Sequence, residues 1–178
     1  MSTWISIDVE ADGPCPGLYS MVSFGAVVVD EKLDKTFYGK VAPITDIYRP
    51  SALEVSGHTR QEHQAFPKPK AEMSRFYAWL EGVREIDSDK RIVMVSDNPA
   101  FDWQFINYYL WAFVGGNPLG FSARRIGDMY GGMVMNALAS NNFKKFRKTQ
   151  HTHNPVDDAK GNAEALLEMK KRGLKVPF

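Results

Sequence analysis

The sequence has a single cysteine, no long apolar run and almost no net charge. Cys15 cannot form an intramolecular disulfide, as expected in a reducing cytosol, and we interpret it as a bystander in chemistry. No apolar stretch approaches the ~18 residues that span a bilayer, and the N-terminus lacks the basic segment of a signal peptide. The net charge of +1 excludes a broadly basic nucleic-acid coat, but not a local basic patch. We therefore expect a cytoplasmic protein without membrane contact.

The composition is otherwise that of an ordinary globular protein, with 44% hydrophobic and 24% charged residues. We find no linker-like segment, so we expect a single domain over residues 1–178. Short β-branched or apolar runs predict five strands, at residues 3–10, 20–30, 35–41, 91–96 and within 120–128. Helical spacing of apolar residues predicts helices at about 73–83 and 101–112. A third helix should run through Met133 to Ala139, and the last from Pro155 to about Arg172.

This order predicts an α/β fold in which helices flank a mixed five-stranded sheet. The first three strands follow one another directly and should form an antiparallel meander, whereas strands separated by helices should be parallel. Residues 140–150 are expected to be a polar, basic loop, and His58 and His63 to lie on the surface.

Two carboxylates lie two residues apart on the predicted first strand. The alternation of a strand sends Asp8 and Glu10 to one face, while Ile5, Ile7 and Val9 point to the core. Two acids on one face repel each other unless cations or protons intervene, and hard divalent cations prefer carboxylate oxygen. A pair of solvated acids at an exposed edge is the alternative, and the D-x-E pattern alone does not decide against it.

A third carboxylate, Asp102, falls near the start of the helix that follows a buried strand. In α/β folds this position lies at the carboxyl end of the sheet, where functional sites collect. An acid there can also simply stabilise the positive end of the helix dipole, although Asp97 and Asn98 are better placed for capping.

The stretch from His151 to Asp158 contains two histidines and two aspartates within eight residues. Asn154 is a suitable N-cap for the last helix, and Pro155 suits its first position. Asp157 then falls at the third helical position, where an acid stabilises the helix terminus. Asp158 is not needed for capping, but helical-wheel angles alone do not choose between the two aspartates for a role in chemistry.

Taken together, these segments resemble the DEDDh family of 3′→5′ exonucleases, especially RNase T-like and oligoribonuclease-like members with an RNase H-like fold. The resemblance rests on D-x-E, N-x-x-F-D and H-x4-D motifs in the family's order, matched by Asp8, Glu10, Asn98, Phe101, Asp102, His153 and Asp158. The segment starting at Pro50 also resembles RNase T-like members. Asp97 departs from the family, in which many members have a histidine at that position.

The resemblance implies two divalent ions, Mg²⁺ or Mn²⁺, that clamp the scissile phosphate. Asp8 would bridge both ions, with Glu10 and Asp158 on the first and Asp102 on the second. His153 would act as the general base for an attacking water, because histidine changes charge near neutral pH. His151 and Asp157 are then expected to be supporting residues.

A basic segment with interleaved aromatics precedes the third motif. Stacking rings and phosphate-binding cations are typical of single-strand binding, although a solvated loop with two anchoring rings explains the pattern equally well. We expect substrate contacts from Asn98, Phe101, Phe143, Lys144, Lys145, Phe146 and Arg147, with Lys148 as a further candidate.

The sequence therefore predicts a metal-dependent exonuclease that degrades single-stranded RNA or DNA from the 3′ end to mononucleotides, with RNA slightly favoured. The alternative is a non-catalytic nucleic-acid-binding relative, or a proofreading subunit that acts with a partner. An RNase H-like endonuclease or transposase fits less well, because its carboxylate pattern does not call for H-x4-D. A homodimer is a further expectation from the resemblance.

Overall fold

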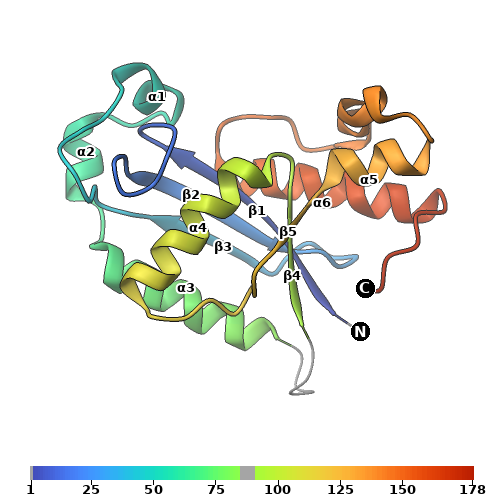
Figure 1. Ribbon diagram of the computed structural model, residues 1–178, viewed down its shortest axis with the longest axis horizontal. Coiled ribbons are helices and arrows are strands. Elements are labelled where there is room, and N and C mark those ends of the chain that lie inside the picture. The colour runs from blue at the N-terminus through green and yellow to red at the C-terminus, as the bar shows by residue number, and fades with distance from the viewer. Residues whose placement is uncertain (1, 85–90) are drawn as a thin grey trace.

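The computed structural model describes residues 2–84 and 91–178, and within them it contains a five-stranded mixed sheet (Figure 1). The strands lie in the order β3-β2-β1-β4-β5. The pairs β1–β2 and β2–β3 are antiparallel, whereas β1–β4 and β4–β5 are parallel. The strands are β1 (Thr3–Ala11), β2 (Met21–Val28), β3 (Thr36–Lys40), β4 (Ile92–Ser96) and β5 (Ala123–Arg125). The predicted antiparallel meander followed by parallel strands is confirmed.

Helices cover both faces of this sheet. The helices are α1 (Pro50–Val55), α2 (Arg60–Ala65), α3 (Pro69–Val83), α4 (Pro99–Phe113), α5 (Ile126–Met133) and α6 (Pro155–Lys171), with the 3₁₀ helix η1 (Ala137–Phe146). One apolar cluster joins α3 and α4 to the sheet through Phe76 and Phe105. A second cluster joins α5, η1 and α6 to the other face through Ile126, Phe143 and Leu166. None of the helices in the described residues is long and apolar enough to cross a bilayer.

The central strand β1 is buried on both of its faces, which explains its apolar composition. Ile5, Ile7 and Val9 face the cluster with α3 and α4, as predicted. Trp4 has the opposite parity and faces the cluster that contains α6. Asp8 shares the parity of Trp4, so its carboxylate lies on the side of the sheet that α6 covers.

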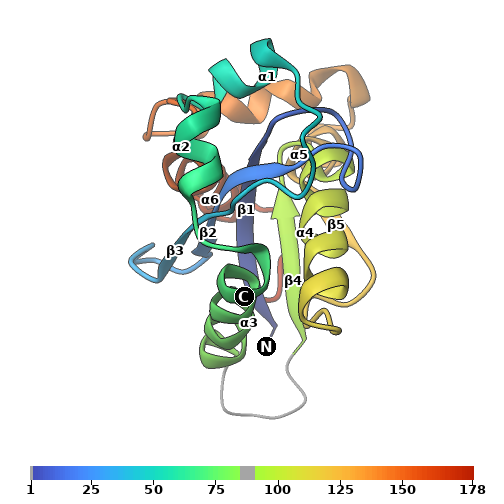
Figure 2. The same cartoon turned by 90° about the vertical axis from the view of Figure 1, so that its left-hand side faces the viewer.

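Two short helices, α1 and α2, were not predicted, and they lie together at one end of the sheet (Figure 2). Each has six residues, too few to show two turns of apolar periodicity. The local signal for α2 is a capping box, in which Thr59 and Glu62 satisfy each other's backbone amides.

The expectation that His63 lies on the surface is wrong, because its side chain is completely buried on α2. Its Nε2 lies 3.3 Å from the carbonyl oxygen of Met21, and its Nδ1 lies 3.3 Å from a guanidinium nitrogen of Arg60. Arg60 in turn makes an ion pair of 3.0 Å with Asp12, which follows β1. Burial lowers the pKa of His63 to about 4, so the ring is neutral, and its contact with Met21 ties α2 to the start of β2. His58 is half-buried.

The segment between α5 and α6 also differs from the prediction. The helix expected to reach residue 139 ends at Met133, and residues 140–146 of the expected loop belong to η1. Met135 adopts a left-handed conformation with a φ of 55°, which breaks the helical path between the two elements.

Candidate active site

The carboxyl end of β1 carries the first two acids of the site. Asp8 and Glu10 lie on one face, as the alternation predicts, and they face the N-terminal part of α6. The neighbouring strand β2 places Gly25 opposite Asp8 in the antiparallel pair. A Cβ atom on Gly25 would lie 2.3 Å from the carbonyl carbon of Pro155. A residue without a side chain is therefore required for α6 to begin against the sheet beside Asp8.

The start of α6 then sets the position of Asp158. The side chain of Asn154 accepts a hydrogen bond of 3.0 Å from the amide of Val156, which confirms the predicted N-cap, and Pro155 occupies the first helical position. Asp157 accepts a hydrogen bond of 3.2 Å from the hydroxyl of Thr152. Asp158, one residue further along the helix, is buried and points toward the sheet.

Three carboxylates meet at this point. Asp8, Glu10 and Asp158 each offer an oxygen, and these oxygens lie within 4.8 Å of one another. Asp102 approaches from α4 and is also buried. One of its oxygens accepts from the amide of Val9 over 3.2 Å, and the other accepts from the Ser96 hydroxyl. These two contacts fix Asp102 between the ends of β1 and β4.

The clustering of these acids changes their proton affinity. Burial, followed by the charges of Asp102, Glu10 and Asp158, raises the pKa of Asp8 well above its usual value. Burial and the charges of Asp158 and Asp102 raise the pKa of Glu10 to about 8. Burial raises the pKa of Asp102 to about 7, although the hydrogen bonds from Ser96 and Val9 oppose that shift.

The donor set fits a divalent metal ion. The three converging donors are carboxylate oxygens, which are the ligands that Mg²⁺ and Mn²⁺ prefer. The raised pKa values show that the carboxylates are destabilised as anions when no cation is near them. A divalent cation would remove this penalty, and the cluster is therefore a candidate metal site.

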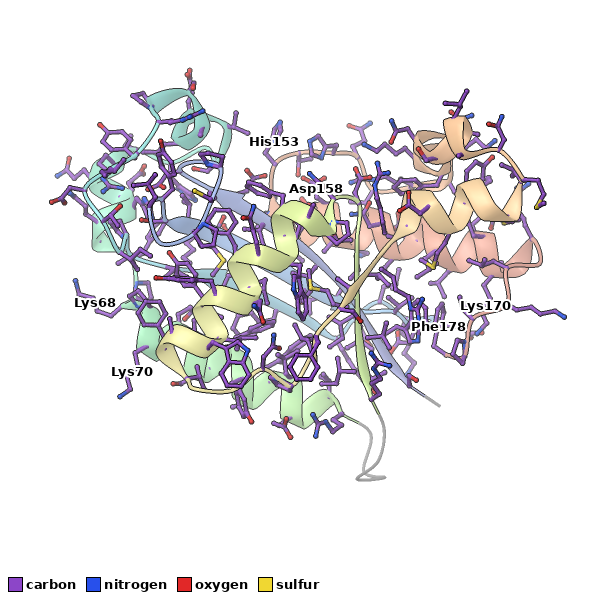
Figure 3. The ribbon with its side chains drawn as sticks, viewed as in Figure 1. Lys68, Lys70, His153, Asp158, Lys170 and Phe178 are labelled. Carbon is purple, nitrogen blue, oxygen red and sulfur yellow. The ribbon has the colours of Figure 1, made fainter. Side chains whose placement is uncertain are left out.

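The two histidines of the third motif both reach this cluster. His153 is exposed on the loop before α6 and lies with Asp158 at one edge of the molecule (Figure 3). Its Nδ1 lies 3.6 Å from a carboxylate oxygen of Glu10. His151 Nδ1 lies 2.7 Å from Oδ1 of Asp158, and the two imidazole centroids are 4.4 Å apart. The contact of His151 with Asp158 is compatible with the supporting role expected of His151.

The basic segment only partly matches its predicted exposure to substrate. Phe143 is completely buried in the cluster with α6, so its ring cannot stack on a base. Arg147 points inward and makes an ion pair of 2.8 Å with Asp158. The expected substrate contacts of these two residues are therefore wrong for this arrangement, because both side chains are taken up by contacts within the fold.

The other expected substrate-binding residues are more accessible. Lys145 and Lys148 are exposed, and Lys144 is half-exposed in an ion pair of 2.7 Å with Asp97. Phe146 is half-buried and its ring packs near Tyr130, with centroids 5.9 Å apart.

Asn98 and Phe101 lie at the start of α4. Asn98 is exposed at the N-cap position, but its side chain makes no capping hydrogen bond, so the expected capping by Asn98 is not found. Phe101 is half-buried, and its centroid lies 5.1 Å from that of Phe105.

Two residues with a role in the site, Ser96 and Gly25, were not identified from the sequence, and Arg147 was expected to contact substrate and not Asp158. Ser96 holds Asp102, Gly25 admits α6, and Arg147 holds Asp158. Ser96 ends a buried strand at the carboxyl edge of the sheet, a position that could have suggested a site residue. For Gly25 and Arg147 the local sequence contains no comparable signal, because their partners are distant in the chain or on another element.

Comparisons with known proteins agree with this geometry. Residues 5–166 match the family model RNase_T, described as an exonuclease. The 3′-5′ DNA exonuclease Cap18 of Escherichia coli is 36% identical over 167 residues, which cover 90% of this chain and 88% of that protein.

Solved structures show the same fold. The nuclease domain of 3′hExo, described as a DEDDh family member bound to rAMP, superimposes with a TM-score of 0.78 at 15% identity, covering 99% of this chain and 95% of that one. Cell-death related nuclease 4 also gives a TM-score of 0.78 at 15% identity, covering 99% of this chain and 66% of that one.

Proposed function

The chain belongs to the DEDDh family of 3′→5′ exonucleases, and from this membership we propose that it removes nucleotides one at a time from the 3′ end of single-stranded nucleic acid. The family consists of phosphodiester hydrolases that use divalent metal ions. The observation that carries the proposal is the meeting of Asp8, Glu10 and Asp158 within 4.8 Å, beside Asp102 and His153. A non-catalytic relative would have no need for this complete set of acids.

We assign a role to each residue of the set. Asp8, Glu10, Asp102 and Asp158 would hold two divalent ions, Mg²⁺ or Mn²⁺. When bound, such ions supply charge for the scissile phosphate and lower the pKa of a water. His153 would take the proton of the attacking water, because its imidazole is exposed at the edge of the carboxylate cluster.

The fold supports these roles by limiting the motion of the carboxylates. Asp102 is held by Val9 and Ser96, so its oxygens cannot rotate freely. Asp8 and Glu10 are carried by the central strand, where they pair with Gly25 and Ser23 of β2. The backbone of His153 is held by Asp158, while its exposed ring lies against Glu10 and His151 at the edge of the cluster, where it could approach a substrate.

For the substrate we place single-stranded DNA first. The sequence alone favours RNA only slightly and does not decide between RNA and DNA. The relative from Escherichia coli, which is 36% identical, is named a DNA exonuclease, and this favours DNA. The choice depends on contacts with the 2′-hydroxyl, which distinguishes RNA from DNA.

The decisive experiment is a cleavage assay with matched single-stranded DNA and RNA oligonucleotides, labelled at the 5′ end, in Mn²⁺, Mg²⁺ or EDTA. We expect a ladder that shortens stepwise from the 3′ end, with mononucleotides as products, only in the presence of a divalent ion. A circular single strand should resist cleavage, and cutting of that circle would instead indicate an endonuclease.

Asp8→Ala is the control for this assay. Removing Asp8 should abolish cleavage and leave the fold intact, because its loss relieves repulsion among the remaining acids in the metal-free protein. Cleavage by Asp8→Ala at the rate of the unmodified protein would contradict the proposed metal site.

We also propose that the chain forms a homodimer and is located in the cytoplasm. A homodimer would be detected by sedimentation equilibrium as twice the mass of 20.1 kDa. A cytoplasmic location would be detected by fractionation of cells that express the tagged chain.

A further inference from the structure

Arg147 follows the basic segment in the sequence but is turned away from solvent. Its side chain is only 10% exposed, and one guanidinium nitrogen lies 2.8 Å from Oδ1 of Asp158, whose side chain is 1% exposed. The same nitrogen lies 3.5 Å from the backbone oxygen of Asp158. The guanidinium therefore contacts both the side chain and the backbone of Asp158, a member of the carboxylate cluster with Asp8 and Glu10.

A glycine on α6 makes room for this side chain. A Cβ atom on Gly161 would lie 2.4 Å from Nε of Arg147 and 2.9 Å from its Cζ. Both distances are too short for real contacts, so any side chain at position 161 would force the guanidinium to move. Glycine is also unfavourable in the middle of a helix, and packing of Arg147 accounts for its presence here.

The guanidinium of Arg147 is only partly hydrogen-bonded. Its Nε is buried and has no hydrogen-bond partner among the described residues. An unsatisfied buried donor costs free energy. The inward position of Arg147 is thus supported by its contact with Asp158 and not by complete hydrogen bonding of the guanidinium.

The carboxylate of Asp158 is consequently held from two directions. Oδ1 contacts Arg147 and also His151, at 2.8 and 2.7 Å. Oδ2 accepts a hydrogen bond of 3.0 Å from the backbone amide of His153. Contacts to both oxygens fix the plane of the carboxylate, while a carboxylate still has lone pairs left for a further ligand. Arg147 is more buried than His151, the other side chain that contacts Oδ1.

We propose that Arg147, seated in the slot left by Gly161, is a positioning residue that orients Asp158 for metal binding. The inference rests on the proposed function, because it requires that Asp158 binds a metal ion. Groups that hydrogen-bond to a metal ligand fix its orientation, and their loss lowers metal affinity by about 10–100-fold. Arg147 acts through Asp158 and does not itself contact the substrate.

The sign of the effect on metal affinity distinguishes positioning from a pure charge effect. A fixed positive charge beside a metal site repels the ion, so its removal would tighten binding if charge alone mattered. If Arg147 positions Asp158, its removal weakens binding despite the loss of that repulsion. A side chain that only stabilises the fold would change the melting temperature and leave the affinity unaltered.

The test is isothermal titration of the metal-free protein with Mn²⁺, well below the melting temperature of each variant. Arg147→Met keeps an unbranched apolar stem and removes the guanidinium with its charge, and we expect Mn²⁺ affinity about 10–100-fold weaker. Arg172→Met is the matched control, because Arg172 is exposed near the end of α6 and pairs with Glu168. Its Mn²⁺ affinity should equal that of the unmodified protein.

A second variant tests the slot without removing the arginine. Gly161→Ala should raise the helix propensity of α6 and yet weaken Mn²⁺ binding about tenfold or more, because it displaces the guanidinium. In an Arg147→Ala background the same change should not weaken binding further. Equal weakening in both backgrounds would show that Gly161 acts independently of Arg147 and would overturn this part of the inference.

Asp158→Asn separates failure of this inference from failure of the proposed function. If Asp158→Asn binds Mn²⁺ as tightly as the unmodified protein, the proposed metal site is wrong. If Asp158→Asn weakens binding but Arg147→Met leaves it unchanged or tighter, the metal site stands and the positioning role of Arg147 is wrong.

Discussion

The backbone amide of His153 donates a hydrogen bond of 3.0 Å to Oδ2 of Asp158, which joins the first and last residues of the H-x4-D motif. His153 has a φ of 60°, a left-handed conformation that is uncommon for residues other than glycine. The loop therefore reverses at this residue, and the imidazole lies near Glu10 while its backbone stays with Asp158. The spacing of the motif is explained by this hydrogen bond.

Replacement of the two histidines should have unequal effects. We expect His153→Ala to lower the rate by about 10²–10⁴-fold, as for loss of a general base, with Mn²⁺ affinity largely kept. His151 is 56% exposed, so its contact with Asp158 is worth little and His151→Ala should cost less than about fivefold. Single-turnover cleavage and Mn²⁺ titration measure both. An inactive His151→Ala beside an active His153→Ala would reverse the assignment.

The two aspartates should differ in the property that they affect. Asp158→Asn removes a charge from the cluster and should reduce both rate and Mn²⁺ affinity. Asp157→Asn should lower stability by about 1 kcal/mol or less, because Asp157 lies in the first turn of α6 and accepts from Thr152. Urea unfolding and Mn²⁺ titration separate these outcomes. A loss of Mn²⁺ affinity in Asp157→Asn would place it among the ligands.

Stability without metal should fall as the pH rises from 6.5 to 8.5. The pKa values of Glu10 and Asp102 are raised to about 8 and about 7, so the folded protein binds more protons than the unfolded chain in this range. Stability gained from a raised pKa is present at low pH and is lost as the pH rises through the folded value. We expect the melting temperature in EDTA to drop by at least about 2 °C.

The controls for this pH effect are a variant and a metal ion. Glu10→Gln removes one of the titrating groups and should flatten the decline. Saturating Mn²⁺ should reverse it, because metal binding improves as the acids lose their protons. The range above pH 6.5 avoids the titration of His63, whose pKa is lowered to about 4. A metal-free protein that gains stability from pH 6.5 to 8.5 would contradict the electrostatic description of the cluster.

The exposed lysines near η1 should contribute to binding of single strands. If Lys145 and Lys148 contact phosphates, replacing each with Ala should reduce the log–log salt slope of binding by about 0.7. Fluorescence anisotropy in an Asp8→Ala background measures binding without cleavage. Lys68 and Lys70, which are exposed and far from His153, are the matched controls (Figure 3). An unchanged slope in the Lys145/Lys148 double variant would leave these lysines as solvated surface.

Patterns confined to one element were predicted well from the sequence. The alternation of β1 placed Asp8 and Glu10 on one face, and Asn154 and Pro155 marked the start of α6. The antiparallel meander of the first three strands and the parallel pairing of the later ones followed from the presence or absence of helices between them, whereas the order of the strands in the sheet comes from the structure. These features depend on periodicity, capping and chain connectivity, which short stretches of sequence encode.

The direction of individual side chains was predicted less well. Phe143 and Arg147 were expected at the surface with the neighbouring lysines, but both point inward. His63 was expected on the surface because its neighbours are polar, but Arg60 and Met21 surround it. Apart from Arg60, which lies on the same helix as His63, their partners come from other elements, and a short stretch of sequence around each residue does not contain them.

The residues proposed for catalysis and their spacing could be read from the sequence, since each motif lies within one strand, helix start or loop. The residues that support them became identifiable only from the packing of the elements. Gly25, opposite Asp8, admits α6 because it has no side chain, and Arg147 reaches Asp158 because Gly161 leaves a slot. Both relationships are steric contacts between elements, and such contacts exist only when the chain has packed.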